Sequence, residues 1–68
     1  MIVQVNGEPV ELSDDATVQT VVEGLDVESG RRGIAVAVNA EVVPRGEWER
    51  RRLSEGVHVE VVTAIQGG

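Results

Sequence analysis

Val57-His58-Val59-Glu60-Val61-Val62 is the stretch of this chain that decides its fold. Valine alternates with the polar residues His58 and Glu60, which is the period-two pattern of a β-strand with one buried face. Such a strand needs a second layer of structure to cover its apolar side. The rest of the chain must therefore supply neighbouring strands and a covering element.

A β-hairpin is expected near the start of the chain. Val3 and Val5 alternate with polar residues, and Asn6-Gly7 follows them as a two-residue turn that fits the twist of paired strands. Val10 and Leu12 then provide the apolar positions of the return strand.

A short helix is expected after the hairpin. Four apolar residues recur at the i, i+3, i+4, i+7 spacing of one helical face: Val18, Val21, Val22 and Leu25. Thr17 is the expected N-cap, Asp14 and Asp15 are expected at the favourable end of the helix dipole, and Gly24 is placed to end the helix. Valine is a mediocre helix former, so packing must hold this element.

Two more strands are expected beyond a loop over residues 26–33. The third strand is 34–38 (IAVAV) and a short fourth is 41–43 (EVV). Pro44 cannot donate to a ladder, so the fourth strand is expected at a sheet edge. The turn Asn39-Ala40 is weaker than Asn-Gly, because a left-handed Ala40 costs about 1 kcal/mol. A turn of another type is the alternative.

The element order is therefore β-β-α-β-β-β, and the fold class is α+β. One helix packed across one face of a mixed sheet of about five strands buries the apolar faces economically, with the first and last strands paired in the middle. This is the ubiquitin-like β-grasp arrangement. We expect residues 1–64 to form the domain and residues 65–68 to form a flexible C-terminal tail.

Composition excludes several functions. The 68 residues include no cysteine, so a disulfide framework, a thiolate metal site and a catalytic thiol are excluded. The net charge of -6 disfavours nucleic acid as a partner. We expect no membrane segment and no signal peptide, a cytoplasmic location, and a monomer in the absence of partners. All six basic residues are arginine, so no lysine side chain here can accept an isopeptide bond.

Three features that suggest chemistry have plainer readings. His58 should face solvent, because no second histidine exists to complete a zinc site, and no metal is expected. Trp48 could dock a partner. Large aromatic residues are mostly buried, however, so we expect Trp48 to fill a gap beneath the edge strand. The run of arginines over residues 50–52 is flanked by acids, so a solvated face of mixed charge is expected.

The end of the chain is its most suggestive feature. Ile65 and Gln66 lead into Gly67 and Gly68. Glycine has no Cβ, so this tail can enter a crevice that other residues would block, and four extended residues reach roughly 13 Å. Such a tail could carry its carboxylate into the active site of another protein.

A partner-docking patch is expected on the outer face of the sheet. By strict alternation, Ile2 and Val62 point away from the buried valines of their strands. Exposed apolar residues on neighbouring strands can form a docking patch, and scattered surface aliphatics are the alternative.

The whole chain resembles the ThiS family, the sulfur carrier proteins of thiamine biosynthesis. The resemblance is carried by four segments in order: residues 5–8 (VNGE), 36–39 (VAVN), 41–45 (EVVPR) with Trp48, and 53–68 (LSEGVHVEVVTAIQGG). Ala40 stands where the family usually has glycine, and the loop Gly30-Arg31-Arg32-Gly33 is longer than usual.

The resemblance implies a carrier that is not itself an enzyme. An ATP-dependent adenylyltransferase would activate the carboxylate of Gly68, sulfur would displace AMP, and the resulting thiocarboxylate would serve thiazole synthase. ATP and the sulfur source would belong to the activating partner, and no cofactor is bound by this chain. Ile65, Gln66 and Gly67 would occupy the crevice of the partner.

Three alternatives stay open. The small subunit of molybdopterin synthase also ends in Gly-Gly but is typically longer and richer in aromatic residues. A carrier for amino-acid sulfuration is a second alternative. A β-grasp module that only binds a partner through its sheet, with an inert tail, is the third.

Overall fold

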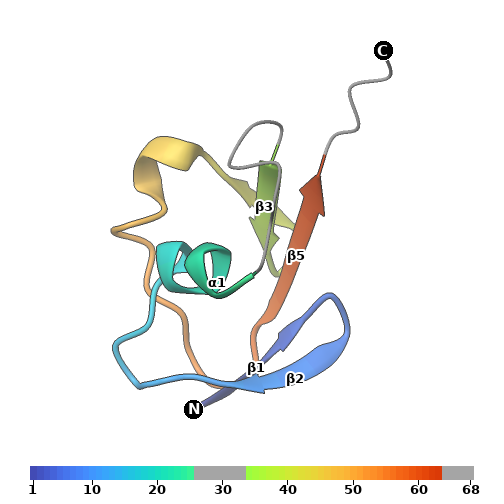
Figure 1. Ribbon diagram of the computed structural model, residues 1–68, viewed down its shortest axis with the longest axis vertical. Coiled ribbons are helices and arrows are strands. Elements are labelled where there is room, and N and C mark those ends of the chain that lie inside the picture. The colour runs from blue at the N-terminus through green and yellow to red at the C-terminus, as the bar shows by residue number, and fades with distance from the viewer. Residues whose placement is uncertain (26–33, 64–68) are drawn as a thin grey trace.

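One α-helix lies across one face of a five-stranded sheet in the computed structural model, which describes residues 1–25 and 34–63 (Figure 1). The elements, in chain order, are β1 (Ile2–Val5), β2 (Glu8–Glu11), α1 (Val18–Gly24), β3 (Ile34–Val38), β4 (Glu41–Val43), the 3-10 helix η1 (Arg45–Glu47) and β5 (His58–Thr63). The predicted order is confirmed. The last strand begins and ends one residue later than the sequence pattern suggested.

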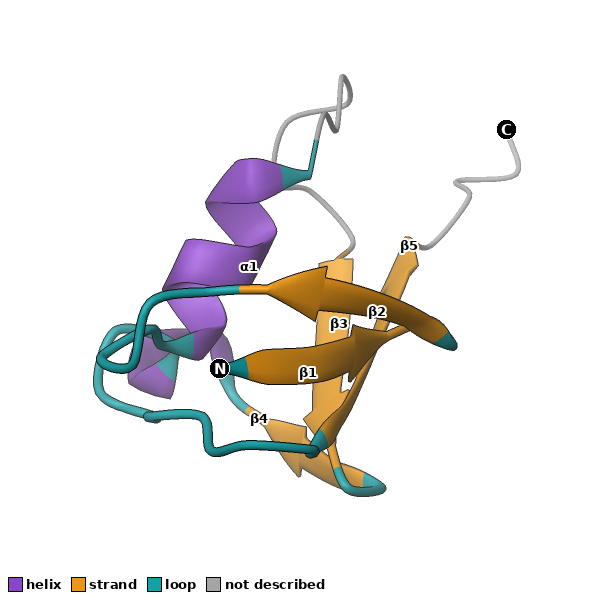
Figure 2. Cartoon of the chain, turned by 90° about the horizontal axis from the view of Figure 1, so that it is seen from below, coloured by secondary structure: helices purple, strands orange, loops and turns teal. Residues whose placement is uncertain are grey.

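The sheet order is β2-β1-β5-β3-β4, so the last strand of the chain is the central one. It runs parallel to β1, with Gln4 opposite His58, and antiparallel to β3, with Val36 opposite Val61. Figure 2 shows α1 on one side of the sheet. The mixed sheet, its central pairing of first and last strands, and the edge position of β4 all agree with the predicted ubiquitin-like β-grasp fold.

The core lies between α1 and the inner face of the sheet. It consists mainly of valines, closed at one end by a tryptophan and a leucine: Val3, Val5, Val18, Val21, Val22, Val36, Val38, Val43, Trp48, Leu53 and Val59. Alternation along the strands and the three-four spacing along α1 aim these side chains at one another. Burial of this apolar surface is the main stabilising contribution to the fold.

The turn between β1 and β2 has the geometry that Asn-Gly favours. Asn6 and Gly7 have φ angles of 51° and 86°, both in the left-handed region. Asparagine and glycine tolerate this region better than other residues, and a turn of this hand matches the twist of the strands. The hairpin therefore forms with Val5 opposite Glu8.

The turn between β3 and β4 has the same left-handed geometry without a glycine. Asn39 and Ala40 have φ angles of 49° and 69°. The alternative of a different turn type is wrong, because Val38 lies directly opposite Glu41 and leaves two residues to close the hairpin. Ala40 is therefore strained by its Cβ.

We expect Ala40→Gly to stabilise the protein. Relief of the left-handed strain contributes about 1–2 kcal/mol, and the greater freedom of glycine in the unfolded chain removes about 0.4–1 kcal/mol. The net gain is about 0.5–1 kcal/mol, measurable by urea unfolding. Ala35→Gly is the matched control: Ala35 lies within β3, so the same substitution there should destabilise the protein. Equal losses in both variants would show that Ala40 carries no strain.

Thr17 is the N-cap of α1, as predicted. It is extended, and its side chain accepts a hydrogen bond from the backbone N–H of Thr20. The Thr20 hydroxyl in turn accepts from the backbone N–H of Thr17 at 3.1 Å. This reciprocal pair satisfies two backbone donors at the start of the helix.

Two further N–H groups at the start of α1 bind a distant part of the chain. The N–H of Val18 donates to the carbonyl oxygen of Arg51 at 3.0 Å, and that of Gln19 donates to the carbonyl oxygen of Trp48 at 3.1 Å. The segment after η1 thus caps the helix from outside. A valine-rich helix of seven residues would be marginal alone, and these tertiary contacts help to hold it.

Asp14 and Asp15 precede the N-cap Thr17, as expected, and have partners outside the helix. The first turn of α1 contains no acidic residue, because the helix begins only after Thr17. Asp14 instead lies 3.3 Å from the N-terminal ammonium of Met1, and Asp15 accepts a hydrogen bond from the Ser13 hydroxyl. Gly24 is the last helical residue, as expected.

Trp48 fills the gap beneath the edge strand, as predicted. Its side chain is buried, and its indole N–H donates to the carbonyl oxygen of Val43 at 2.9 Å. The guanidinium carbon of Arg45 lies 5.3 Å from the centre of the ring, which is within cation–π range. Trp48 thus fixes the end of β4 to the segment that caps α1.

Candidate functional site

The tail residues Ile65, Gln66, Gly67 and Gly68 lie outside the described residues, as does the loop over residues 26–33. The described part of the candidate site is therefore the strand from which the tail continues and the outer face of the sheet around it. Thr63 ends β5, the central strand of the sheet. Whatever the tail binds must be positioned relative to this strand.

Ile2 and Val62 both point outward, as alternation predicted. Their side chains are 45% and 60% exposed, while Val3 and Val59 on the same strands are almost fully buried. The alternation of inward and outward side chains therefore holds along both β1 and β5. Each side chain therefore lies on the outer face of the sheet. Figure 2 shows α1 against the other face.

The register places Ile2 and Val62 far apart on that face. The backbone N–H of Gly56 donates to the carbonyl oxygen of Ile2, and Gln4 pairs with His58. Val62 lies six residues beyond Gly56, which is about 20 Å along a strand at about 3.3 Å per residue. The two residues do not form one contiguous patch.

Val62 instead has apolar neighbours on β3 and β4. It lies opposite Ala35 on β3, and Ala37, two residues along, lies opposite Val42 on β4. Val42 is 71% exposed, more than Ile2 or Val62. We define the outer apolar surface by four residues: Ala35, Ala37, Val42 and Val62. The alternation of Val42 with the inward Val43 would have allowed its prediction from the sequence.

Asn6 binds the backbone of β5 near the start of the tail. Its side-chain oxygen accepts from the N–H of Val61 at 2.8 Å, and its side-chain nitrogen donates to the carbonyl oxygen of Val61 at 3.2 Å. Its own backbone N–H donates to the carbonyl oxygen of Val59 at 2.8 Å. Asn6 thus pairs with Val61 as a further residue of β1 would.

Asn39 makes a related contact at the other end of β5, with His58. Its side-chain oxygen accepts from the backbone N–H of His58 at 2.9 Å, and its backbone N–H donates to the carbonyl oxygen of His58 at 2.7 Å. Asn6 and Asn39 occupy equivalent first positions of the two hairpin turns. Neither contact was predicted, because a turn asparagine gives no signal of a distant partner.

The described residues carry little that could perform chemistry. His58 is exposed on the outer face, as predicted, and no group of three or more potential metal ligands occurs within residues 1–25 and 34–63. The arginine run has structural uses: Arg51 is half-buried and lies 3.6 Å from Glu41, and Arg52 forms a β-bridge with Thr17. Over the same residues, no helix is long and apolar enough to span a membrane.

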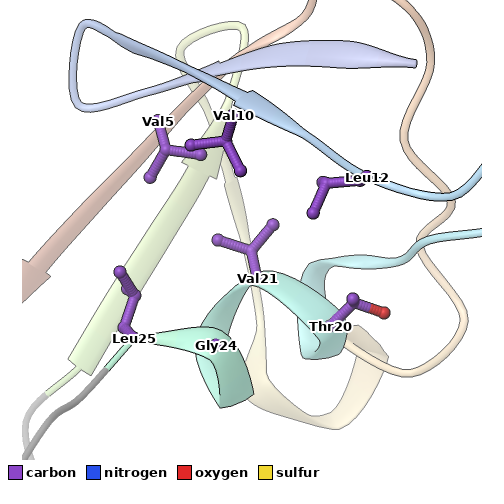
Figure 3. Close-up of a pocket in the computed structure, with 7 residues that line it drawn as sticks. All are labelled: Val5, Val10, Leu12, Thr20, Val21, Gly24 and Leu25. Carbon is purple, nitrogen blue, oxygen red and sulfur yellow. The ribbon is translucent and has the colours of Figure 1, made fainter.

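A small apolar pocket lies between the β1–β2 hairpin and α1 (Figure 3). Its volume is about 150 Å³, and it is lined by Val5, Val10, Leu12, Thr20, Val21, Gly24 and Leu25. No lining side chain is ionisable, and the one hydroxyl, on Thr20, already accepts from the backbone of Thr17. The pocket therefore offers no ionisable group that could act as an acid or a base.

Comparison with known proteins identifies the family of this chain. The model of the ThiS family matches residues 3–68. The uncharacterized protein ycf40 of Porphyra purpurea is 30% identical over 66 residues, which cover 97% of this chain and 90% of that protein. The crystal structure of a thiamine biosynthesis protein (ThiS) from Geobacter metallireducens matches with a TM-score of 0.81 and 26% identity, covering 100% of both chains. This chain belongs to the ThiS family.

Proposed function

We propose that this chain is a sulfur carrier protein of thiamine biosynthesis, and that Gly68 is its modified residue. The observation that carries the proposal is the family match over residues 3–68, which extends through the glycine pair. The similarity to a solved ThiS protein along the full length of both chains supports it. The chain acts as a co-substrate of partner enzymes and is not itself an enzyme.

The proposed chemistry uses only the terminal carboxylate of this chain. An adenylyltransferase positions ATP so that an oxygen of the Gly68 carboxylate attacks the α-phosphorus, forming an acyl adenylate and releasing pyrophosphate. A sulfur nucleophile from the donor then attacks the acyl carbon, and AMP leaves. The product is a thiocarboxylate, whose sulfur is a nucleophile for thiazole synthase. Activation is needed because a free carboxylate is a poor electrophile.

The composition fits a carrier of this kind. Without cysteine, the chain cannot hold sulfur as a persulfide, so the terminal carboxyl is the site at which sulfur can be attached and released. Without lysine, the activated terminus cannot form an isopeptide bond to a side chain of another copy. The first feature favours the terminal carboxyl as the site of sulfur, and the second excludes attachment to a lysine of another copy of this chain.

The outer apolar surface is the proposed docking site for the activating enzyme. It adjoins the end of β5, so a partner that grips the tail must approach it. We expect Val62→Glu to weaken binding by several kcal/mol, since a buried unpaired charge is costly, while the fold is retained. Titration calorimetry with the activating enzyme, together with circular dichroism, measures both quantities.

Two control variants make that prediction sharper. Ile2→Glu places the same charge on the same face but at the far end, and should bind normally. Val59→Glu places it in the core, where Val59 is 1% exposed, and should unfold the domain. Normal binding by Val62→Glu would show that this surface does not contact the enzyme.

Reconstitution tests the proposed function. The chain, an activating enzyme of the ThiS pathway, ATP and sulfide are combined with thiazole synthase and its other substrates, and formation of the thiazole is measured. We expect formation to depend on this chain. Transfer of sulfur to the large subunit of molybdopterin synthase, with none to thiazole synthase, would favour that alternative. An unreactive terminus in both systems would favour a β-grasp module that only binds.

A further inference from the structure

We infer that Asn6 is a positioning residue for the tail: its side chain extends the paired part of β5 to Val61 and so fixes the point from which the tail continues. The inference deepens the proposed sulfur-carrier function and depends on it. Asn6 is far from the modified terminus in sequence, and among the described residues its side chain forms hydrogen bonds with the backbone of Val61.

The geometry shows why a side chain is needed here. Strand β1 ends at Val5, whose partner on β5 is Val59. The chain then turns away at Asn6 and Gly7, both in left-handed conformations. On the β1 side, Val61 would therefore have no backbone partner, because β1 has no further residue to offer it. The amide of Asn6 carries a donor and an acceptor, as a backbone residue does, and it supplies both to Val61.

The consequence concerns the outer apolar surface as well as the tail. Val62 and Thr63 complete β5 and are held on the other side by β3, with Val62 opposite Ala35 and Thr63 opposite Ile34. Both side-chain hydrogen bonds of Asn6 are exposed to solvent, so their loss leaves no buried polar group unpaired. Removing the side chain should thus allow the last residues of β5 to fray without unfolding the domain. A partner would then have to order them again on binding.

The chain contains a matched control. Asn39 occupies the same turn position, with a φ angle of 49° against 51° for Asn6, and its side chain also accepts from a β5 amide. That amide belongs to His58, at the opposite end of the strand from the tail. Asn6→Gly and Asn39→Gly therefore remove similar side-chain contacts, keep a residue that tolerates a positive φ, and differ in which end of β5 they release.

Two measurements test the inference on the full chain. Amide hydrogen exchange should show loss of protection at Val61 in Asn6→Gly and at His58 in Asn39→Gly. ATP–pyrophosphate exchange with the activating enzyme should show a KM for the carrier raised about tenfold in Asn6→Gly, which corresponds to about 1.4 kcal/mol. The kcat should stay within about twofold, because only binding shared by ground and transition states is lost. Asn39→Gly should change KM by less than about twofold.

Folding is checked by thermal melts, and Asn6→Asp is measured in parallel. The aspartate variant keeps the acceptor for the Val61 N–H and loses the donor, so a smaller rise in KM is expected. It also provides the comparison if Asn6→Gly melts below the assay temperature. Equal changes in KM for the substitutions at positions 6 and 39, or an unchanged KM when Val61 has lost protection, would overturn the positioning role. Absence of exchange with the unmodified chain would instead refute the proposed function.

Discussion

Gly67→Val is expected to keep its fold and to lose adenylation by the activating enzyme completely. Valine adds a branched Cβ next to the terminal residue, where the proposed crevice admits a chain without side chains. Gly67 lies four residues beyond Thr63, the last residue of β5, so we expect the free energy of unfolding to change by no more than about 0.5 kcal/mol. ATP–pyrophosphate exchange measures the first effect and a thermal melt the second.

Removal of Gly68 is the companion variant. It keeps Gly67 but shortens the reach of the carboxylate by about 3.3 Å, which is enough to take it out of line with a bound nucleotide. A residue added after Gly68 should also abolish adenylation, because it carries the carboxylate past the bound nucleotide. Full exchange activity in any of these three variants would contradict the proposed fit between the tail and a narrow crevice.

Trp48→Ala is expected to unfold the protein or bring it close to unfolding. Truncation of a buried tryptophan costs about 3–5 kcal/mol, and a chain of this length is stable by only about 3–10 kcal/mol in total. The loss includes the hydrogen bond to Val43 and weakens the segment that caps α1. Urea unfolding followed by far-ultraviolet circular dichroism is the suitable measurement, because the variant has no tryptophan fluorescence.

Trp48→Phe separates the packing from the hydrogen bond. Phenylalanine keeps an aromatic ring in the core but cannot donate to the carbonyl oxygen of Val43, and loss of that hydrogen bond costs about 0.5–1.5 kcal/mol. The variant should therefore fold, with a lower midpoint than the unmodified chain. A midpoint for Trp48→Ala equal to that of Trp48→Phe would mean that the ring contributes little to the core.

Local sequence signals predicted most of the fold. Asn6-Gly7 formed the expected turn, Thr17 formed the expected cap, and Pro44 follows an edge strand. Each signal depends on a residue and its near neighbours in sequence. Alternation also identified the outward-facing side chains correctly, because it depends only on the pleat of the strand.

The sequence did not predict which residues of two distant strands lie next to each other. Alternation gives the face of a residue, but the distance between Ile2 and Val62 depends on the register between β1 and β5, which a turn does not fix when the strands are far apart in the chain. The contact of Asn6 with Val61 spans 55 residues and was missed for the same reason.

The mass of the C-terminal peptide tests the central claim most directly. The chain is incubated with its activating enzyme, ATP and a sulfur source, and is then cleaved after arginine to release residues 53–68. We predict that this peptide gains the mass difference between one sulfur and one oxygen, and that fragmentation places the gain on Gly68. An unchanged peptide, or a gain that maps upstream of Gly67, would contradict the account.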